Sequence, residues 1–157
     1  MATDAFPFVV ALGKANRYAD LPAANDALAL VLLKNAGLQA DPVLKDHPTL
    51  AAILAASNDE CDFTGYSRRT LAGVSVAPNF AIDTQSTDAD DPAVYTNADA
   101  VAQVSGAAVV VYVPDVGVST DADMIPLYNL MEGTVTFDPG VPVDPSFDAA
   151  GLFTAAG

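Results

Sequence analysis

The sequence predicts a mainly β fold, antiparallel and β-sandwich-like, with one short α-helix around residues 47–57. Two observations predict the strands. Short runs of β-branched and aromatic residues recur along the chain with glycine and proline between them, a spacing typical of sandwiches. One run, residues 107–113, is continuously apolar between Gly106 and Pro114, which indicates a strand buried on both faces.

The helix is predicted from a third observation, the apolar spacing that follows Asp46. Asp46 can cap the first turn, and Pro48 is tolerated in that turn because its missing N–H would have no helical partner there. Leu50, Ile53 and Leu54 then form one apolar stripe. A helix this short depends on packing for its stability.

The remaining segments are assigned in chain order. Residues 26–35 fit two structures, because their run of apolar residues suits a buried strand, whereas Asn25 and Gly37 suit the two ends of a helix. Residues 60–82 place aromatic and β-branched residues between turn-forming residues, which predicts the short strands of a hairpin or meander. Further strands are expected at residues 6–12, 93–96, 125–130 and 134–137, and loops at residues 14–24, 83–91 and 115–123.

The length of 157 residues predicts a single domain with a sizeable core. We assign residues 1–140 to one β-rich domain. Residues 141–157 are expected to form an extended tail that packs on the surface or on a neighbouring molecule. Leu152 and Phe153 are its predicted apolar anchor.

The charge of the chain argues against two classes of partner. The net charge is −14, and all six basic residues lie at or before Arg69. The first 69 residues therefore carry a net charge of −2 and the remainder −12. A nucleic-acid partner is not expected, because such proteins gain affinity by neutralising phosphates with lysine and arginine. A membrane is not expected either, since anionic lipid would repel this chain and no apolar run approaches the ~20 residues of a spanning helix.

Three side chains are weighed as catalytic groups, and none is favoured. Cys61 is the only cysteine, and its neighbours Glu60 and Asp62 would raise its thiol pKa. His47 is the only histidine, and the G-x-S-x-G pattern of a nucleophile elbow is absent from the sequence. Glu132 has apolar neighbours but is most simply a glutamate at a strand edge. We therefore expect no enzymatic activity and no cofactor.

Two expected loops share the sequence Ser-Thr-Asp-Ala-Asp, at residues 86–90 and 119–123. Alternate aspartates can converge on a calcium ion. An EF-hand loop needs glycine at its sixth position and glutamate at its twelfth, and neither loop has them. Solvated acidic turns are the favoured interpretation, so no metal site is predicted.

Four residues of the central stretch are candidates for docking a partner: Arg68, Arg69, Tyr66 and Phe63. The two arginines can pair with acidic groups of a neighbouring subunit, or equally with acidic groups of the same chain. The two aromatic residues, like Tyr112, can anchor an interface, although core packing is the default for such side chains.

The ordered set of segments in this chain resembles a family of small virion proteins of tailed bacteriophages, especially those of actinobacterial hosts. The resemblance spans roughly residues 27–127, and no single segment carries it alone. In that family the first segment appears as a strand, which favours a strand for residues 26–35. The segments are ALALVLLKNAGL, LKDHPTLAAILAASNDE, FTGYSRRTL, AAVVVYVPD and STDADMIPL.

The resemblance implies a structural particle component without catalytic residues. The expected role is a capsid decoration protein on the outer surface of the virion head, made in the host cytoplasm. Its partner would be the major capsid protein, and self-association into a cyclic oligomer, for example a trimer, is expected. The alternatives are a tail or tail-tip protein, which would bind tail proteins or a receptor, and a calcium-dependent binding module.

Overall fold

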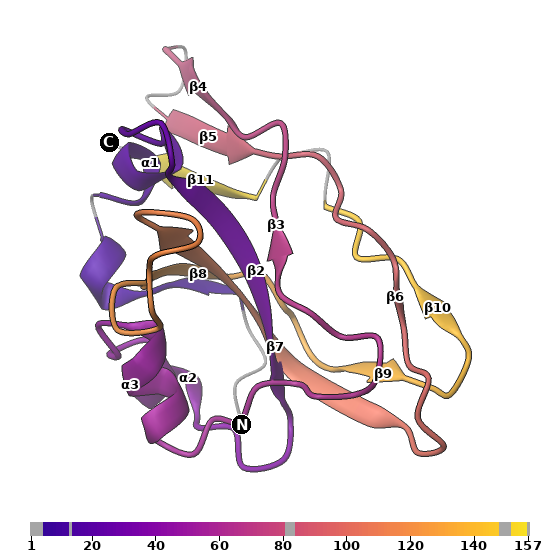
Figure 1. Ribbon diagram of the computed structural model, residues 1–157. Coiled ribbons are helices and arrows are strands. Elements are labelled where there is room, and N and C mark those ends of the chain that lie inside the picture. Colours follow the sequence, from indigo (N-terminus) through magenta and orange to yellow (C-terminus); the bar gives the residue numbers. More distant parts are fainter. Residues whose placement is uncertain (1–4, 13, 81–83, 148–151, 157) are drawn as a thin grey trace.

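The structure, a computed structural model, describes residues 5–12, 14–80, 84–147 and 152–156 (Figure 1). Its described part is mainly β with antiparallel strand pairing, so the predicted fold class is confirmed. The helices are α1 (Ala15–Ala19), α2 (Asp41–Leu44) and α3 (Leu50–Ala55), with a 3-10 helix η1 (Val9–Ala11). The strands are β1 (Phe6–Pro7), β2 (Ala27–Lys34), β3 (Arg69–Thr70), β4 (Ser75–Asn79), β5 (Thr84–Asp88), β6 (Tyr95–Thr96), β7 (Gln103–Val113), β8 (Ile125–Asn129), β9 (Val135–Phe137), β10 (Pro142–Val143) and β11 (Phe153–Ala156).

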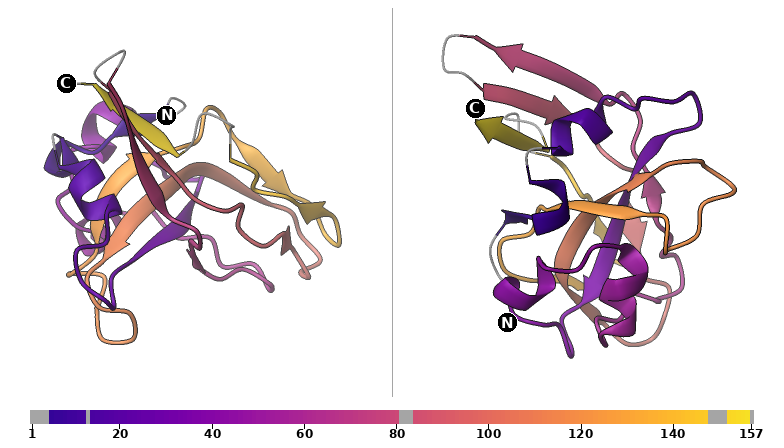
Figure 2. Two further views of the ribbon diagram at one scale, coloured as in Figure 1. Left: turned by 90° about the horizontal axis from the view of Figure 1, so that it is seen from above. Right: turned by 90° about the vertical axis from the view of Figure 1, so that its left-hand side faces the viewer.

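Three sheets make up the fold. The largest has six strands in the order β1-β8-β7-β2-β3, with β9 pairing with one end of β7. Strands β11, β5 and β4 form a second sheet, and β10 pairs with β6 in a third. The β4–β5 hairpin projects beyond the central sheet in all three views (Figures 1 and 2).

Strands β2 and β7 form the centre of the largest sheet. Their pairing runs from Ala27 opposite Val113 to Lys34 opposite Ser105, with one register shift next to Lys34. Successive side chains of a strand point to opposite faces, and both faces of this pair are buried. The two segments are therefore continuously apolar because neither has a face in contact with water, and residues 26–35 form a strand rather than a helix.

Two hydrophobic cores lie on opposite faces of the central sheet. The helix-side core is covered by α2, α3 and the N-terminal strand, and the tail-side core is covered by strands β6 and β9 and by Leu152. Figure 2 shows α2 and α3 on one side of the sheet and the β6–β10 pair on the other, whereas α1 contributes Ala19 to the tail-side core. The helix-side core includes Phe8, Val31, Leu33, Leu44, Leu50 and Ile53, and the tail-side core includes Leu28, Leu30, Cys61, Phe63, Tyr95 and Phe137.

The predicted helix around residues 47–57 is confirmed as α3, but its cap differs from the prediction. The N-cap is Thr49, whose hydroxyl accepts a hydrogen bond from the backbone N–H of Ala52 at 3.2 Å. Asp46 lies one turn too early to reach these N–H groups. Leu50 and Ile53 are fully buried in the helix-side core, so the short helix is held by its apolar stripe, as expected.

Three loop and strand assignments from the sequence are corrected. The expected loop at residues 14–24 contains α1, and the expected strand at residues 6–12 is only β1 followed by η1. The expected loop at residues 83–91 contains β5, although Asp83 itself lies outside the described residues. Strand β5 pairs with β4 on one side and with β11 on the other. Backbone pairing on both sides makes it a strand despite its polar sequence.

The C-terminal residues contribute strands to the small sheets. Strand β10 pairs with β6, and β11 pairs with β5 from Phe153 opposite Thr87 to Ala156 opposite Thr84. Leu152 is buried in the tail-side core, as its predicted role as an anchor requires. Residues 148–151 lie outside the described part. Among the described residues, no helix is long and apolar enough to cross a membrane.

Gly65 allows the turn after Phe63 to lie directly against strand β6. Its φ is +104°, and a Cβ built there would lie 2.2 Å from the carbonyl oxygen of Thr96. Gly117, in the loop between β7 and β8, also has a positive φ, of +91°, but a Cβ there would meet no atom within 4 Å. A side chain at Gly117 would therefore meet only the strain of a positive φ, whereas a side chain at Gly65 would meet that strain and a steric clash.

We predict that Gly65→Ala destabilises the protein by more than about 3 kcal/mol, because it adds a backbone clash to the strain of a positive φ. Gly117→Ala is the matched control and should cost about 1–2 kcal/mol, the strain alone. Urea unfolding followed by circular dichroism measures both values. Equal losses for the two variants would contradict the close approach of this turn to β6.

Candidate functional site

Arg68 joins three separate parts of the chain. Its guanidinium donates to both carboxylate oxygens of Glu60, at 2.7–3.1 Å, and to the carboxylate of Asp121 in the loop before β8. The Arg68 side chain is 28% exposed and that of Glu60 20% exposed. The two carboxylates bind two neighbouring edges of this guanidinium, with Nη2 donating to both, and both raise the pKa of Arg68. The sequence left open whether Arg68 pairs within the chain, and the structure places both of its acidic partners there.

Tyr66 extends this network to the central sheet. Its hydroxyl donates to Glu60 at 2.7 Å and accepts a hydrogen bond from the backbone N–H of Leu32 in β2 at 3.1 Å. Burial, reinforced by the charge of Glu60, raises the pKa of Tyr66 well above its ordinary value. One glutamate therefore accepts from both Tyr66 and Arg68, and Tyr66 satisfies a backbone donor of β2.

Arg69 lies against an aromatic ring of the tail-side core. Its guanidinium carbon is 4.6 Å from the centre of the Tyr95 ring, a cation–π arrangement. It also donates to the Ser67 hydroxyl at 3.0 Å and to the Val94 carbonyl at 3.3 Å. The Tyr95 hydroxyl is buried with no hydrogen-bond partner among the described residues. Burial raises the pKa of Tyr95 to about 12, although the charge of Arg69 opposes this shift.

Phe63 belongs to the core rather than to an open surface. It is 3% exposed, and its ring stacks on Phe137 with the ring centres 4.9 Å apart. Tyr66 and Tyr95 complete the aromatic cluster, with centres 5.6 and 6.3 Å from that of Phe63. Tyr112 is also buried, and its hydroxyl donates to Asp26 at 2.8 Å. Phe63 and Tyr112 therefore pack in the core, as is usual for aromatic side chains of this kind.

The four candidate docking residues thus all have partners within the fold. Arg68 and Tyr66 share Glu60, and Arg69 and Phe63 contact Tyr95. The division of charge along the sequence also does not separate the molecule into two halves, because β2 and β7 are neighbours in one sheet. Contact of these residues with a partner protein stays a prediction.

The two Ser-Thr-Asp-Ala-Asp segments have different structures. The first begins in strand β5. The second forms turns before β8, where the carboxylate of Asp123 accepts hydrogen bonds from the backbone and the hydroxyl of Thr120, which lower its pKa. Asp121 of the same segment binds Arg68. Within the described ranges, no group of three or more His, Cys, Asp or Glu side chains is placed to hold a metal ion.

The three side chains considered as catalytic groups lie in different environments. Cys61 is 2% exposed, and burial raises the pKa of its thiol to about 12. A thiol in this environment is a poor nucleophile. His47 is half-buried at the entry to α3, with its Nε2 atom 2.7 Å from the side-chain oxygen of Gln39. Glu132 is exposed.

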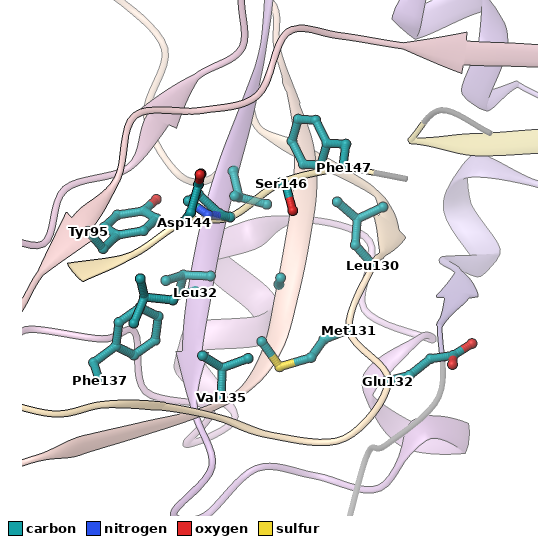
Figure 3. A pocket seen from close by; sticks show the side chains of 14 residues that line it. Leu32, Tyr95, Leu130, Met131, Glu132, Val135, Phe137, Asp144, Ser146 and Phe147 are labelled. Carbon is teal, nitrogen blue, oxygen red and sulfur yellow. The ribbon is translucent and has the colours of Figure 1, made fainter. Parts of the chain in front are cut away.

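Sequence reasoning missed a pocket on the tail side of the central sheet (Figure 3). Its volume is about 290 Å³. Strands β2 and β7 supply its floor, residues 130–137 supply one wall, and residues 143–147 supply another. These parts are far apart in the sequence, so no local pattern marks the pocket. The nearest signal was the apolar surroundings of Glu132, which lies at its edge.

The pocket combines an apolar interior with acidic groups at its edge. Leu32, Val135 and Phe137 line it, and in Figure 3 the side chain of Glu132 extends away from these apolar groups. Asp144 lies at the other side of the pocket in that view. Both acidic residues are exposed, and none of the described lining residues is basic. The arrangement can bind an apolar group and attract a positive charge beside it.

Comparisons with protein-family models, curated proteins and solved structures find no match.

We predict that Arg68→Ala lowers the free energy of unfolding by about 2 kcal/mol, because it leaves Glu60 and Asp121 without their cation. Arg17→Ala is the matched control, since Arg17 is exposed on α1 and its loss should cost less than about 0.5 kcal/mol. Arg68→Lys should recover only part of the loss, because lysine cannot bind two carboxylates with a planar fork. Equal stability of the two alanine variants in urea unfolding would show that the network contributes nothing.

A second pair of variants tests the two buried hydroxyls. At neutral pH we expect Tyr66→Phe to cost about 1–3 kcal/mol, because Leu32 and Glu60 lose a hydrogen-bond partner. Tyr95→Phe should cost less than Tyr66→Phe, because within the described residues the Tyr95 hydroxyl makes no hydrogen bond of good geometry and only Arg69 lies close to it. Above pH 10 the unfolded state releases the Tyr95 proton while the folded state retains it up to about pH 12. Stability should therefore fall as pH rises through this window.

The Tyr95→Phe variant should lose about 2 kcal/mol less than the unsubstituted protein over that window. Urea unfolding at several pH values, with tyrosinate absorbance recorded on the same samples, measures the difference. Parallel pH profiles for the two proteins would rule out a buried, neutral Tyr95.

Proposed function

We propose that this chain is a structural component of a tailed-bacteriophage virion, a decoration protein bound to the outer surface of the head. The segments between residues 27 and 127 resemble, in order, those of small virion proteins of tailed bacteriophages, and this resemblance supports the proposed role. The partner would be the major capsid protein, and several copies would associate around a symmetry axis. The protein would be made in the host cytoplasm and act in the particle without catalysing a reaction.

The charge distribution is the observation that carries the proposal. Lys34 pairs with Asp62 at 2.8 Å, and Arg68 pairs with Glu60 and Asp121. These basic groups are neutralised within the fold, while the whole chain has a net charge of −14. Such a molecule is repelled by nucleic-acid phosphates. A protein on the outside of a head benefits from this property, because it does not compete for the DNA packaged inside.

Many copies of a decoration protein must also stay separate before they assemble. A strong net charge keeps free copies apart in solution. The central sheet, buried on both faces, gives each copy a fixed shape to present to a lattice. An acidic, fixed β domain therefore suits a repeated structural role.

Immunogold electron microscopy on particles from the producing phage tests the proposal. With antibody raised against this chain, we expect gold over the heads. Gold on the tail would replace the head assignment with the tail alternative. No gold on any particle, with the antibody shown to bind the free protein and detergent-opened particles also unlabelled, would remove the virion proposal altogether.

A further inference from the structure

The pocket on the tail side of the sheet has a buried apolar floor and walls that include the half-buried Leu130, Val135 and Phe147. Leu30 and Leu32 of β2 and Ala108 of β7 lie at its floor, and the same residues belong to the tail-side core. Protein interiors are packed to high density, and voids much larger than a water molecule are few. A hollow of about 290 Å³ next to a core is therefore a candidate for an apolar group from another molecule.

The size of the hollow restricts what it can hold. Sites for drug-sized molecules and cofactors usually measure about 300–1,000 Å³, so this pocket lies just below the lower end of that range. It has room for one large side chain. Interfaces between proteins commonly concentrate their binding energy in a side chain of that kind seated in a well-packed pocket.

The charge beside the pocket restricts the partner further. Glu132 and Asp144 are both exposed and line the hollow. An apolar side chain whose sequence neighbours are lysine or arginine would place positive charges beside these carboxylates. Acidic neighbours would be repelled, both by this edge and by the net charge of the chain.

We propose that this pocket binds an apolar side chain of a partner protein, flanked on the partner by basic residues. Residues 143–147 form one wall, so the C-terminal part of the chain completes the binding site. That this partner is a virion protein rests on the proposed function, whereas peptide binding by the pocket does not.

The test uses the full chain, labelled with nitrogen-15, and three synthetic peptides. One peptide has phenylalanine between lysines, the second has phenylalanine between glutamates, and the third has alanine between lysines. We expect the first alone to shift the backbone amide signals of Leu32, Ala108 and Val135. Its binding should weaken as salt is added, because exposed charges are screened.

Matched variants locate the binding. Ser146→Trp and Val135→Phe each place a large side chain in the hollow, and each should weaken binding of the first peptide roughly tenfold or more. Glu132→Gln combined with Asp144→Asn should weaken it about three- to tenfold. The control Asp20→Asn removes an exposed carboxylate outside the pocket and should change nothing. Thermal unfolding of each variant confirms that the fold is kept.

Several results would overturn the proposal. Equal binding of the lysine- and glutamate-flanked peptides would contradict the proposal that basic residues flank the partner's apolar side chain. If no amide signal of the pocket shifted at millimolar peptide, the pocket would not be a peptide-binding site. A second copy is the other possible occupant, since Phe80 at the end of β4 is 87% exposed. Pocket signals that move with protein concentration, and no longer do so in Phe80→Ala, would assign the pocket to self-association instead.

The two proposals fail separately. If the peptide bound but no particle carried gold, the pocket proposal would stand and the virion proposal would be rejected. If gold lay over the heads but the peptide did not bind, the virion proposal would stand and the docking surface would lie elsewhere on the chain.

Discussion

The pairing of β2 with β7 is the constraint on which the rest of the structure depends. Eight residues of β2 lie against β7, and both faces of the pair are buried. Strands β1, β3, β8 and β9 extend this sheet, and α2, α3 and β6 cover its faces. The helices α2 and α3 cover one face, and α1, β6, β9 and the turn around Phe63 cover the other. The pocket lies on this second side, between residues 130–137 and 143–147, over a floor that is itself buried.

The polar network around Glu60 holds the connections to this sheet in place. Arg68, just before β3, and Tyr66 both donate to Glu60, and Tyr66 also accepts from the backbone of Leu32. The ion pair between Arg68 and Asp121 connects the loop before β8 to this network. Because the same arginine binds carboxylates from both the weakly and the strongly acidic parts of the sequence, these parts form one folding unit rather than two charged halves.

How much could be predicted from the sequence depended on whether the signal was local. Residues 107–113 were assigned correctly because their apolar run lies between a glycine and a proline, and α3 because its stripe has helical spacing. The residue pattern alone left residues 26–35 open, since a strand buried on both faces lacks the alternation that identifies most strands, and only the family resemblance favoured a strand. Strand β5 was missed because its polar residues resemble a loop, and only its pairing with β4 and β11 makes it a strand. The pocket was beyond local patterns, because five separate segments build it.

The distance along the chain between β2 and β7 has a consequence for synthesis. Ribosomes add about 5–20 residues per second, so β2 is complete several seconds before its partner strand exists. During that interval only one edge of β2 can pair, with β3 and residues 59–61, and the edge that β7 later covers has no partner strand. The acidic residues that later keep the molecules apart are mostly encoded after Arg69, so the early nascent chain is nearly neutral as well as apolar. The central sheet can therefore close only late in synthesis, when β7 adds to the free edge of β2.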